Sequence, residues 1–133
     1  MKNRSLIVMT VVLAFVLFAG MALAATHTPQ EITTSGLNIT PETTVATANE
    51  FDNDGSMFLY LNNGSGATLY YTVTVPGQIA GFSIEDITGS VANGVTEYVG
   101  PFDPTYCNAA DGNVDYALST TSSVSVAVLE LDY

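Results

Sequence analysis

The chain has 133 residues, enough for one domain of ordinary size. It carries 13 acidic residues and only two basic ones, Lys2 and Arg4, which both lie at its very start. The rest of the chain has no Lys or Arg to neutralise phosphate, which excludes nucleic-acid binding, an arginine phosphate clamp and a Walker lysine. A single cysteine, Cys107, excludes an internal disulfide.

Residues 1–24 are typical of a secretory signal peptide. The two basic residues precede an apolar run of about 20 residues, and Ala22-Leu23-Ala24 supplies the small residues that signal peptidase reads. We therefore expect cleavage before Ala25 and a secreted protein, extracellular or at the cell surface, with no membrane association after cleavage. The alternative is an uncleaved anchor, because about 20 apolar residues are enough to span a bilayer.

Residues 25–50 are rich in Thr and poor in large apolar residues, and two prolines interrupt any helix. The spacing of Ile32, Leu37 and Ile39 suits one short extended segment. We predict an N-terminal arm that can act as a donor strand. It would cover a sheet edge of its own domain, giving a monomer, or of a neighbouring copy, giving a polymer.

From residue 51 onward, short β-type runs alternate with turn signals. Strands are predicted at 57–61, 68–75, 90–92, 95–99, 114–118 and 124–131, with weaker strand character over 79–87. Asn93-Gly94 predicts a two-residue hairpin, and the slip in alternation at Leu129 predicts a bulge or burial on both faces. The pattern predicts a single small antiparallel all-β sandwich, immunoglobulin-like or jelly-roll-like, over residues 51–133.

Two Asp-rich segments resemble pieces of calcium loops, because they alternate side-chain oxygens along a tight turn. The candidate ligands are Asp52, Asp54, Asp111, Asn113 and Asp115, and the candidate ion is calcium. Both segments lack the distal Glu of an EF-hand, and Asp, Asn and Gly also gather in turns for backbone reasons alone. With no internal cations, the acidic domain must in any case be screened by cations from the medium.

No convincing catalytic set is present. A Ser/His/Asp arrangement would have to use His27, which we expect on the arm, and a sandwich of this size offers little room for a substrate cleft, so we expect no enzyme. Asn38 and Asn63 begin N-glycosylation sequons. Cys107 is expected to be a small buried side chain, the alternative being a bond between chains.

The stretch from about Ser35 to Leu131 carries several motifs in a characteristic order. They are Gly36-Leu37, Asn53-Asp54-Gly55, Phe58-Leu59-Tyr60-Leu61-Asn62-Asn63-Gly64, Thr72-Val73-Thr74-Val75, Ile79-Ala80-Gly81-Phe82, Gly100-Pro101-Phe102-Asp103-Pro104 followed by Tyr106, Asp111-Gly112-Asn113-Val114 and Ser123-Val124-Ser125-Val126-Ala127-Val128. The stretch resembles small virion structural proteins of tailed phages, of the head-decoration type. The resemblance implies a compact β-sandwich that packs against copies of itself or a larger lattice, without enzymatic activity.

The signal peptide, the arm and the resemblance together predict a secreted, non-enzymatic structural protein. Its β-sandwich subunits would associate with copies of themselves into an extracellular filament or surface assembly. Two alternatives stay open: a phage-type virion decoration protein, and a monomeric secreted module that binds carbohydrate or calcium.

Overall fold

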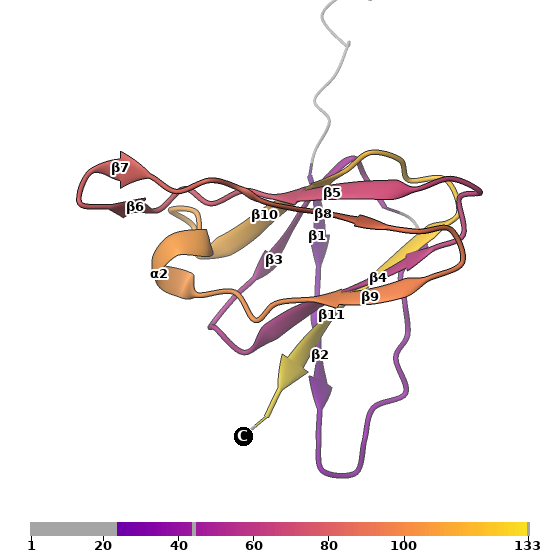
Figure 1. Ribbon diagram of the computed structural model, residues 1–133. Coiled ribbons are helices and arrows are strands. Elements are labelled where there is room, and N and C mark those ends of the chain that lie inside the picture. The colour runs from indigo at the N-terminus through magenta and orange to yellow at the C-terminus, as the bar shows by residue number, and fades with distance from the viewer. Residues whose placement is uncertain (1–23, 44, 133) are drawn as a thin grey trace, which may run out of the picture.

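The computed structural model describes residues 24–43 and 45–132, so the predicted signal peptide, apart from Ala24, lies outside the described residues. The strands are β1 (Ala25–His27), β2 (Pro29–Ile32), β3 (Ala48–Asp52), β4 (Met57–Asn63), β5 (Leu69–Val73), β6 (Gln78–Ile79), β7 (Phe82–Ser83), β8 (Ile87–Val91), β9 (Thr96–Val99), β10 (Asn113–Leu118) and β11 (Val124–Leu131), and helix α2 (Pro104–Cys107) precedes β10. A five-stranded sheet has the order β1-β3-β10-β5-β8, and a four-stranded sheet has the order β2-β11-β4-β9. Both sheets contribute to one hydrophobic core, which confirms the predicted all-β sandwich (Figure 1).

The central strands form because their apolar residues recur with a period of two. In β4 the side chains of Met57, Leu59 and Leu61 are buried, whereas the intervening Phe58 and Tyr60 are half-buried on the outer face. Such alternation places one face of a strand against the core and the other toward solvent. The inward-facing residues of both sheets meet in a single cluster of aliphatic and aromatic side chains.

Strand β11 is buried on both faces. Its register with β4 is unbroken from Val124, opposite Asn63, to Glu130, opposite Met57. Ala127 and Leu129 point away from the inward-facing positions of β11, yet they are buried as well. The slip in the sequence pattern at Leu129 therefore reflects two-sided burial and not a bulge.

The Asn93-Gly94 turn joins the two sheets, and the hairpin predicted for it was wrong. β8 pairs with β5 in the five-stranded sheet, whereas β9 pairs with β4 in the four-stranded sheet. Gly94 has the positive φ of +77° that the turn requires, and its N–H donates to the carbonyl of Asn63 at 2.6 Å. An Asn-Gly pair specifies a tight turn, but it does not specify that the flanking strands pair with each other.

The predicted N-terminal arm takes part in both sheets. β1 pairs in parallel with β3, and the chain then runs directly into β2, which pairs in parallel with β11 (Figure 1). The two strands therefore cover one edge of each sheet, and the opposite edges are β8 and β9. In the structure the arm covers the edges of its own subunit, the first of the two placements that the sequence left open.

Candidate functional site

The attachment of the N-terminal strands is slight. β1 pairs with β3 over three residues and β2 pairs with β11 over four. The predicted arm residues Ile32, Leu37 and Ile39 are only partly buried, and none of them belongs to the core cluster. The first apolar side chain along the described chain that packs against the core is Val45. Backbone pairing and polar contacts, rather than apolar burial, therefore hold the arm.

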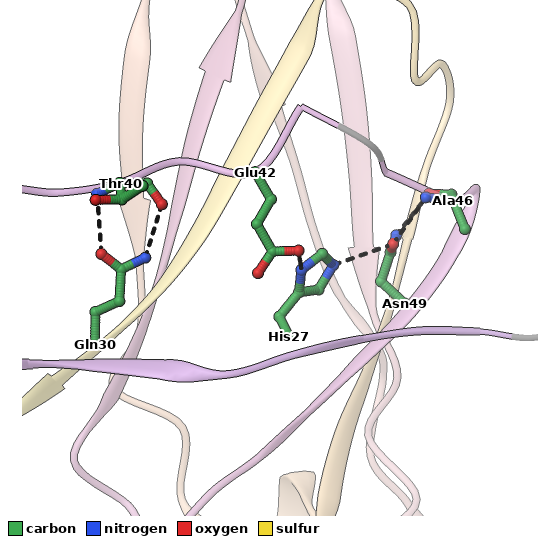
Figure 2. Close-up of polar contacts among 6 residues, drawn as sticks. All are labelled: His27, Gln30, Thr40, Glu42, Ala46 and Asn49. Carbon is green, nitrogen blue, oxygen red and sulfur yellow. Dashed lines mark hydrogen bonds and ion pairs between the residues drawn. The ribbon is translucent and has the colours of Figure 1, made fainter.

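One buried side chain anchors the arm, and it is polar. Among the described residues from 24 to 48, His27 is the only one that is buried. Its Nδ1 lies 2.9 Å from a carboxylate oxygen of Glu42, and its Nε2 lies 3.3 Å from Oδ1 of Asn49 (Figure 2). The ring thereby connects β1 with β3 and with the segment that returns from β2 to β3.

The amide of Asn49 is held in a defined orientation by the backbone of Ala46. The Ala46 N–H donates to Oδ1 of Asn49 at 3.2 Å, and Nδ2 of Asn49 donates to the Ala46 carbonyl at 2.7 Å. The reversed amide would place donor against donor and acceptor against acceptor. The oxygen of Asn49, and not its nitrogen, therefore faces His27.

A second polar contact lies on β2. The side-chain amide of Gln30 donates to the carbonyl of Thr40 and accepts from the Thr40 N–H, both at 2.9 Å (Figure 2). It binds the returning segment in the way that a neighbouring strand would. The contacts of His27, Gln30, Glu42 and Asn49 together form what we call the polar clamp.

The electrostatic surroundings of the clamp are acidic and partly apolar. The ring of Tyr116, on β10, lies 5.9 Å from the ring of His27. The hydroxyl of Tyr116 is buried without a hydrogen-bond partner, and burial together with the nearby Glu42 carboxylate raises the pKa of that phenol. Glu42 itself is partly open to solvent, with 43% of its side chain exposed.

Sequence reasoning placed His27 on a loosely held arm and missed this role. A signal for it exists in the composition. His27 is the only ionisable nitrogen side chain left after residue 24, in a segment that contains all 13 acidic residues. A carboxylate partner for His27 was therefore to be expected on electrostatic grounds.

The two Asp-rich segments lie next to each other, where the N–H of Asn53 donates to the carbonyl of Gly112 at 3.4 Å. Side-chain amide hydrogen bonds join the first segment to the residues on either side of α2. Nδ2 of Asn53 donates to Oδ1 of Asn108 at 2.6 Å and to the carbonyl of Phe102 at 3.1 Å. In return, Nδ2 of Asn108 donates to the carbonyl of Asn53 at 2.8 Å. Asn53 is buried, so this amide network fixes the first Asp-rich loop to the segment that carries α2.

The candidate calcium ligands stand at several places around these loops. Asp54 accepts from the hydroxyl and the N–H of Ser56, which lowers the pKa of its carboxyl, and it lines an open hollow on the side of Glu130 and Asp132. Asp111 accepts from the N–H of Asn113 at 3.1 Å. These carboxylates cap their own turns.

The other candidates lie along β3 and β10. Asp52 is the cross-strand partner of Asn113, and Glu50 is that of Asp115. Burial, followed by the charges of Asp111 and Glu50, raises the pKa of Asp115. Calcium binding by this set stays a prediction, and no group of three or more His, Cys, Asp or Glu able to hold a metal is found within the described part of the chain.

Three further residues singled out by the sequence have clear positions. Asn38 is exposed, whereas Asn63 is fully buried and its Nδ2 donates two hydrogen bonds of 2.8 Å to backbone carbonyls. Cys107 is buried at the end of α2, and burial raises the pKa of its thiol. Its thiol is therefore not presented for a bond between chains in this conformation.

Comparison of the chain with family models, curated proteins and solved structures found no match. In the segments that the structure describes, no helix has the length and apolar character needed to cross a membrane. The polar clamp and the way in which it holds β1 and β2 are thus the main structural basis for a proposal about function.

Proposed function

We propose that the mature chain is a secreted, non-enzymatic structural subunit that associates with copies of itself by exchanging its N-terminal strands. The main support is the attachment of β1 and β2, which lie on the edges of both sheets and bury only one side chain, that of His27. A strand held by backbone pairing forms the same hydrogen bonds with the equivalent edge of a second copy. Exchange of such an element is a low-cost route to assembly.

The connection behind β2 is long enough for exchange. Residues 33–41 form nine residues between the last residue of β2 and Glu42, whose backbone pairs with Val126 on β11. Fully extended, such a segment reaches about 30 Å, which is the width of a small domain. The arm can therefore reach a neighbour while Glu42 keeps its place on β11. When each arm serves the next subunit, the assembly is open-ended.

The charge of the chain sets the conditions for such an assembly. Residues 25–133 carry 13 carboxylates and no Lys or Arg, so neighbouring subunits repel one another. Salt screens this repulsion and should strengthen association. Nucleic acid is not a partner for so acidic a surface.

A pair of cysteines tests whether the arm pairs within one chain or between chains. Thr26 and Glu50 are register partners on β1 and β3, and their side chains are in contact at 2.7 Å. Neighbouring strands lie about 4.8 Å apart, which suits a disulfide. Thr26→Cys with Glu50→Cys, in a Cys107→Ala background, is oxidised at high protein concentration and analysed by non-reducing electrophoresis.

Exchange between copies predicts a ladder of covalent oligomers on the non-reducing gel. Electron microscopy of the native chain should show extended assemblies. The matched control is Asp52→Cys with Asn113→Cys, a cross-strand pair on β3 and β10 that does not involve the arm and should stay within one chain. A cross-linked monomer alone from the first pair, at every concentration and salt tested, would refute the proposal.

A further inference from the structure

We propose that His27 is a proton-dependent latch. With both ring nitrogens protonated, the ring holds β1 on its own sandwich. Loss of one proton weakens the clamp and frees the arm to exchange. The consequence for assembly rests on the proposed function, whereas the latch itself rests on contacts within one chain.

The two partners of the ring both accept hydrogen bonds. Glu42 offers a carboxylate oxygen at 2.9 Å from Nδ1, and Asn49 offers its amide oxygen at 3.3 Å from Nε2. The contacts of Asn49 with Ala46 prevent the amide from turning its nitrogen to the ring. Both ring nitrogens must therefore donate, and only the doubly protonated imidazolium does so.

A neutral ring cannot satisfy this site. It has one N–H, so its other nitrogen would face an oxygen with lone pair against lone pair in a buried place. The proton between Nδ1 and the Glu42 carboxylate could instead lie on Glu42, but the docked clamp would then hold the same number of protons. Because the Glu42 side chain is 43% exposed, water stabilises its ionised form, which favours the proton on the ring.

The groups around the ring act in opposite directions. Burial disfavours a charged ring, whereas the carboxylate of Glu42 favours it. Tyr116, packed against the ring from β10, stays neutral because its pKa is raised. Glu50 on β3 and Asp115 on β10 lie on the opposite, outer face of the sheet, where they add only negative potential.

The sign of the pH dependence follows from counting protons. The docked clamp requires a ring with two protons, whereas the ring of a released arm can be neutral, with one. Docking therefore takes up a proton whenever the released ring is neutral. Docking is thus strongest in acid, where the ring carries both protons, and weakens at higher pH, where one of them is lost. We expect the protection of residues 25–32 against hydrogen exchange, corrected for intrinsic rates, to fall at least about tenfold between about pH 5 and about pH 8.

Hydrogen exchange of the native mature chain, followed by mass spectrometry, measures this change. Two variants give the contrast. His27→Gln has no ionisable ring in the clamp and should give weaker protection that does not change with pH. Gln30→Ala removes the other contact of the polar clamp and should lower protection at both pH values while keeping the pH dependence. Nitrogen NMR measures the protonation state of the imidazole directly, and its signals are easily assigned because His27 is the only histidine in the chain.

Both ring nitrogens should show protonated shifts at about pH 5. A neutral ring at that pH in the docked arm, or equal protection at both pH values in the wild type, would overturn the latch. The cysteine pair described above separates the two ideas. Oligomers that form in both His27→Gln and wild type, together with protection that does not change with pH, refute the latch and leave strand exchange standing. pH-dependent protection without any intermolecular bond supports the latch and refutes strand exchange.

Discussion

Replacing Asn53 by Asp distinguishes a hydrogen-bonded pair of turns from a pair of calcium loops. In a calcium loop an added carboxylate supplies a further ligand and strengthens binding. In the structure, the amide nitrogen of Asn53 donates to Asn108 at 2.6 Å and to the Phe102 carbonyl at 3.1 Å, from a buried position. A carboxylate there would face two acceptors and donate to neither.

The expected loss follows from these contacts. Two donated hydrogen bonds are lost, at about 1 kcal/mol each, and the unpaired buried carboxylate costs about 1–3 kcal/mol more. Asn108 cannot turn its amide to help without losing its own bond to the carbonyl of Asn53. We therefore expect Asn53→Asp to lower the free energy of unfolding by about 3–5 kcal/mol at neutral pH.

Urea unfolding of the mature chain, with and without calcium, measures this loss. The matched control is Asn113→Asp, which makes the same change of charge at a half-buried side chain on β10, opposite Asp52, and should cost no more than about 1 kcal/mol. The loss in Asn53→Asp should shrink in acid, where the introduced carboxyl takes up a proton and can donate one bond. Equal stability of the two variants would refute the account of the amide network, and recovery of Asn53→Asp by calcium would show that these loops bind the ion.

Three further predictions concern stability and are measured by the same unfolding assay. Asp115→Asn should stabilise the fold by about 0.5 kcal/mol near pH 7. Burial and two neighbouring carboxylates raise the pKa of Asp115, so the folded chain holds that proton more tightly than the unfolded chain, and the gain should vanish below about pH 4. Tyr116→Phe removes a buried hydroxyl without a partner and should leave stability unchanged or raise it by about 1 kcal/mol, whereas a loss would mean that the hydroxyl is bonded. Asn63→Ala removes two hydrogen bonds donated by a fully buried amide, one to the buried carbonyl of Val91 and one to the carbonyl of Ala67, and should cost about 2–3 kcal/mol, unlike Asn38→Ala on the exposed surface, where no more than about 0.5 kcal/mol is expected.

The central strands could be predicted because their signal is local. The alternation in β4 and β11 indicates which side chains face the core, and the structure agrees with it. Where the alternation slips, at Leu129, β11 is buried on both faces. The pairing of strands is not local in this sense. Asn93-Gly94 specifies a turn whether the next strand returns in the same sheet or crosses to the other, so the sequence could not distinguish a hairpin from a corner.

The N-terminal strands lacked a visible signal for a physical reason. β1 and β2 bind through backbone groups, which every sequence carries, and bury only His27. Hydrophobic periodicity cannot detect such strands. The Asp-rich segments were ambiguous for another reason, because the same residue types occur in turns and in calcium sites. The amide contacts between Asn53 and Asn108, which the sequence does not reveal, show what holds the first of these segments in place.

The cost of leaving the β11 edge open limits how the arm can move. β11 is the longest strand described, it is apolar, and β2 covers its outer edge from Val128 to Leu131. Without β2, that edge would offer unpaired backbone groups beside buried apolar side chains, which is a template for non-specific aggregation. By contrast, the edge strands β8 and β9 on the other side are short, and β9 carries Glu97. A released arm therefore cannot remain free for long, because its edge is refilled either by the same arm or by that of a neighbour. Protein concentration then determines whether the same arm or the arm of a neighbour refills the edge, while protonation of His27 determines how often the arm is released.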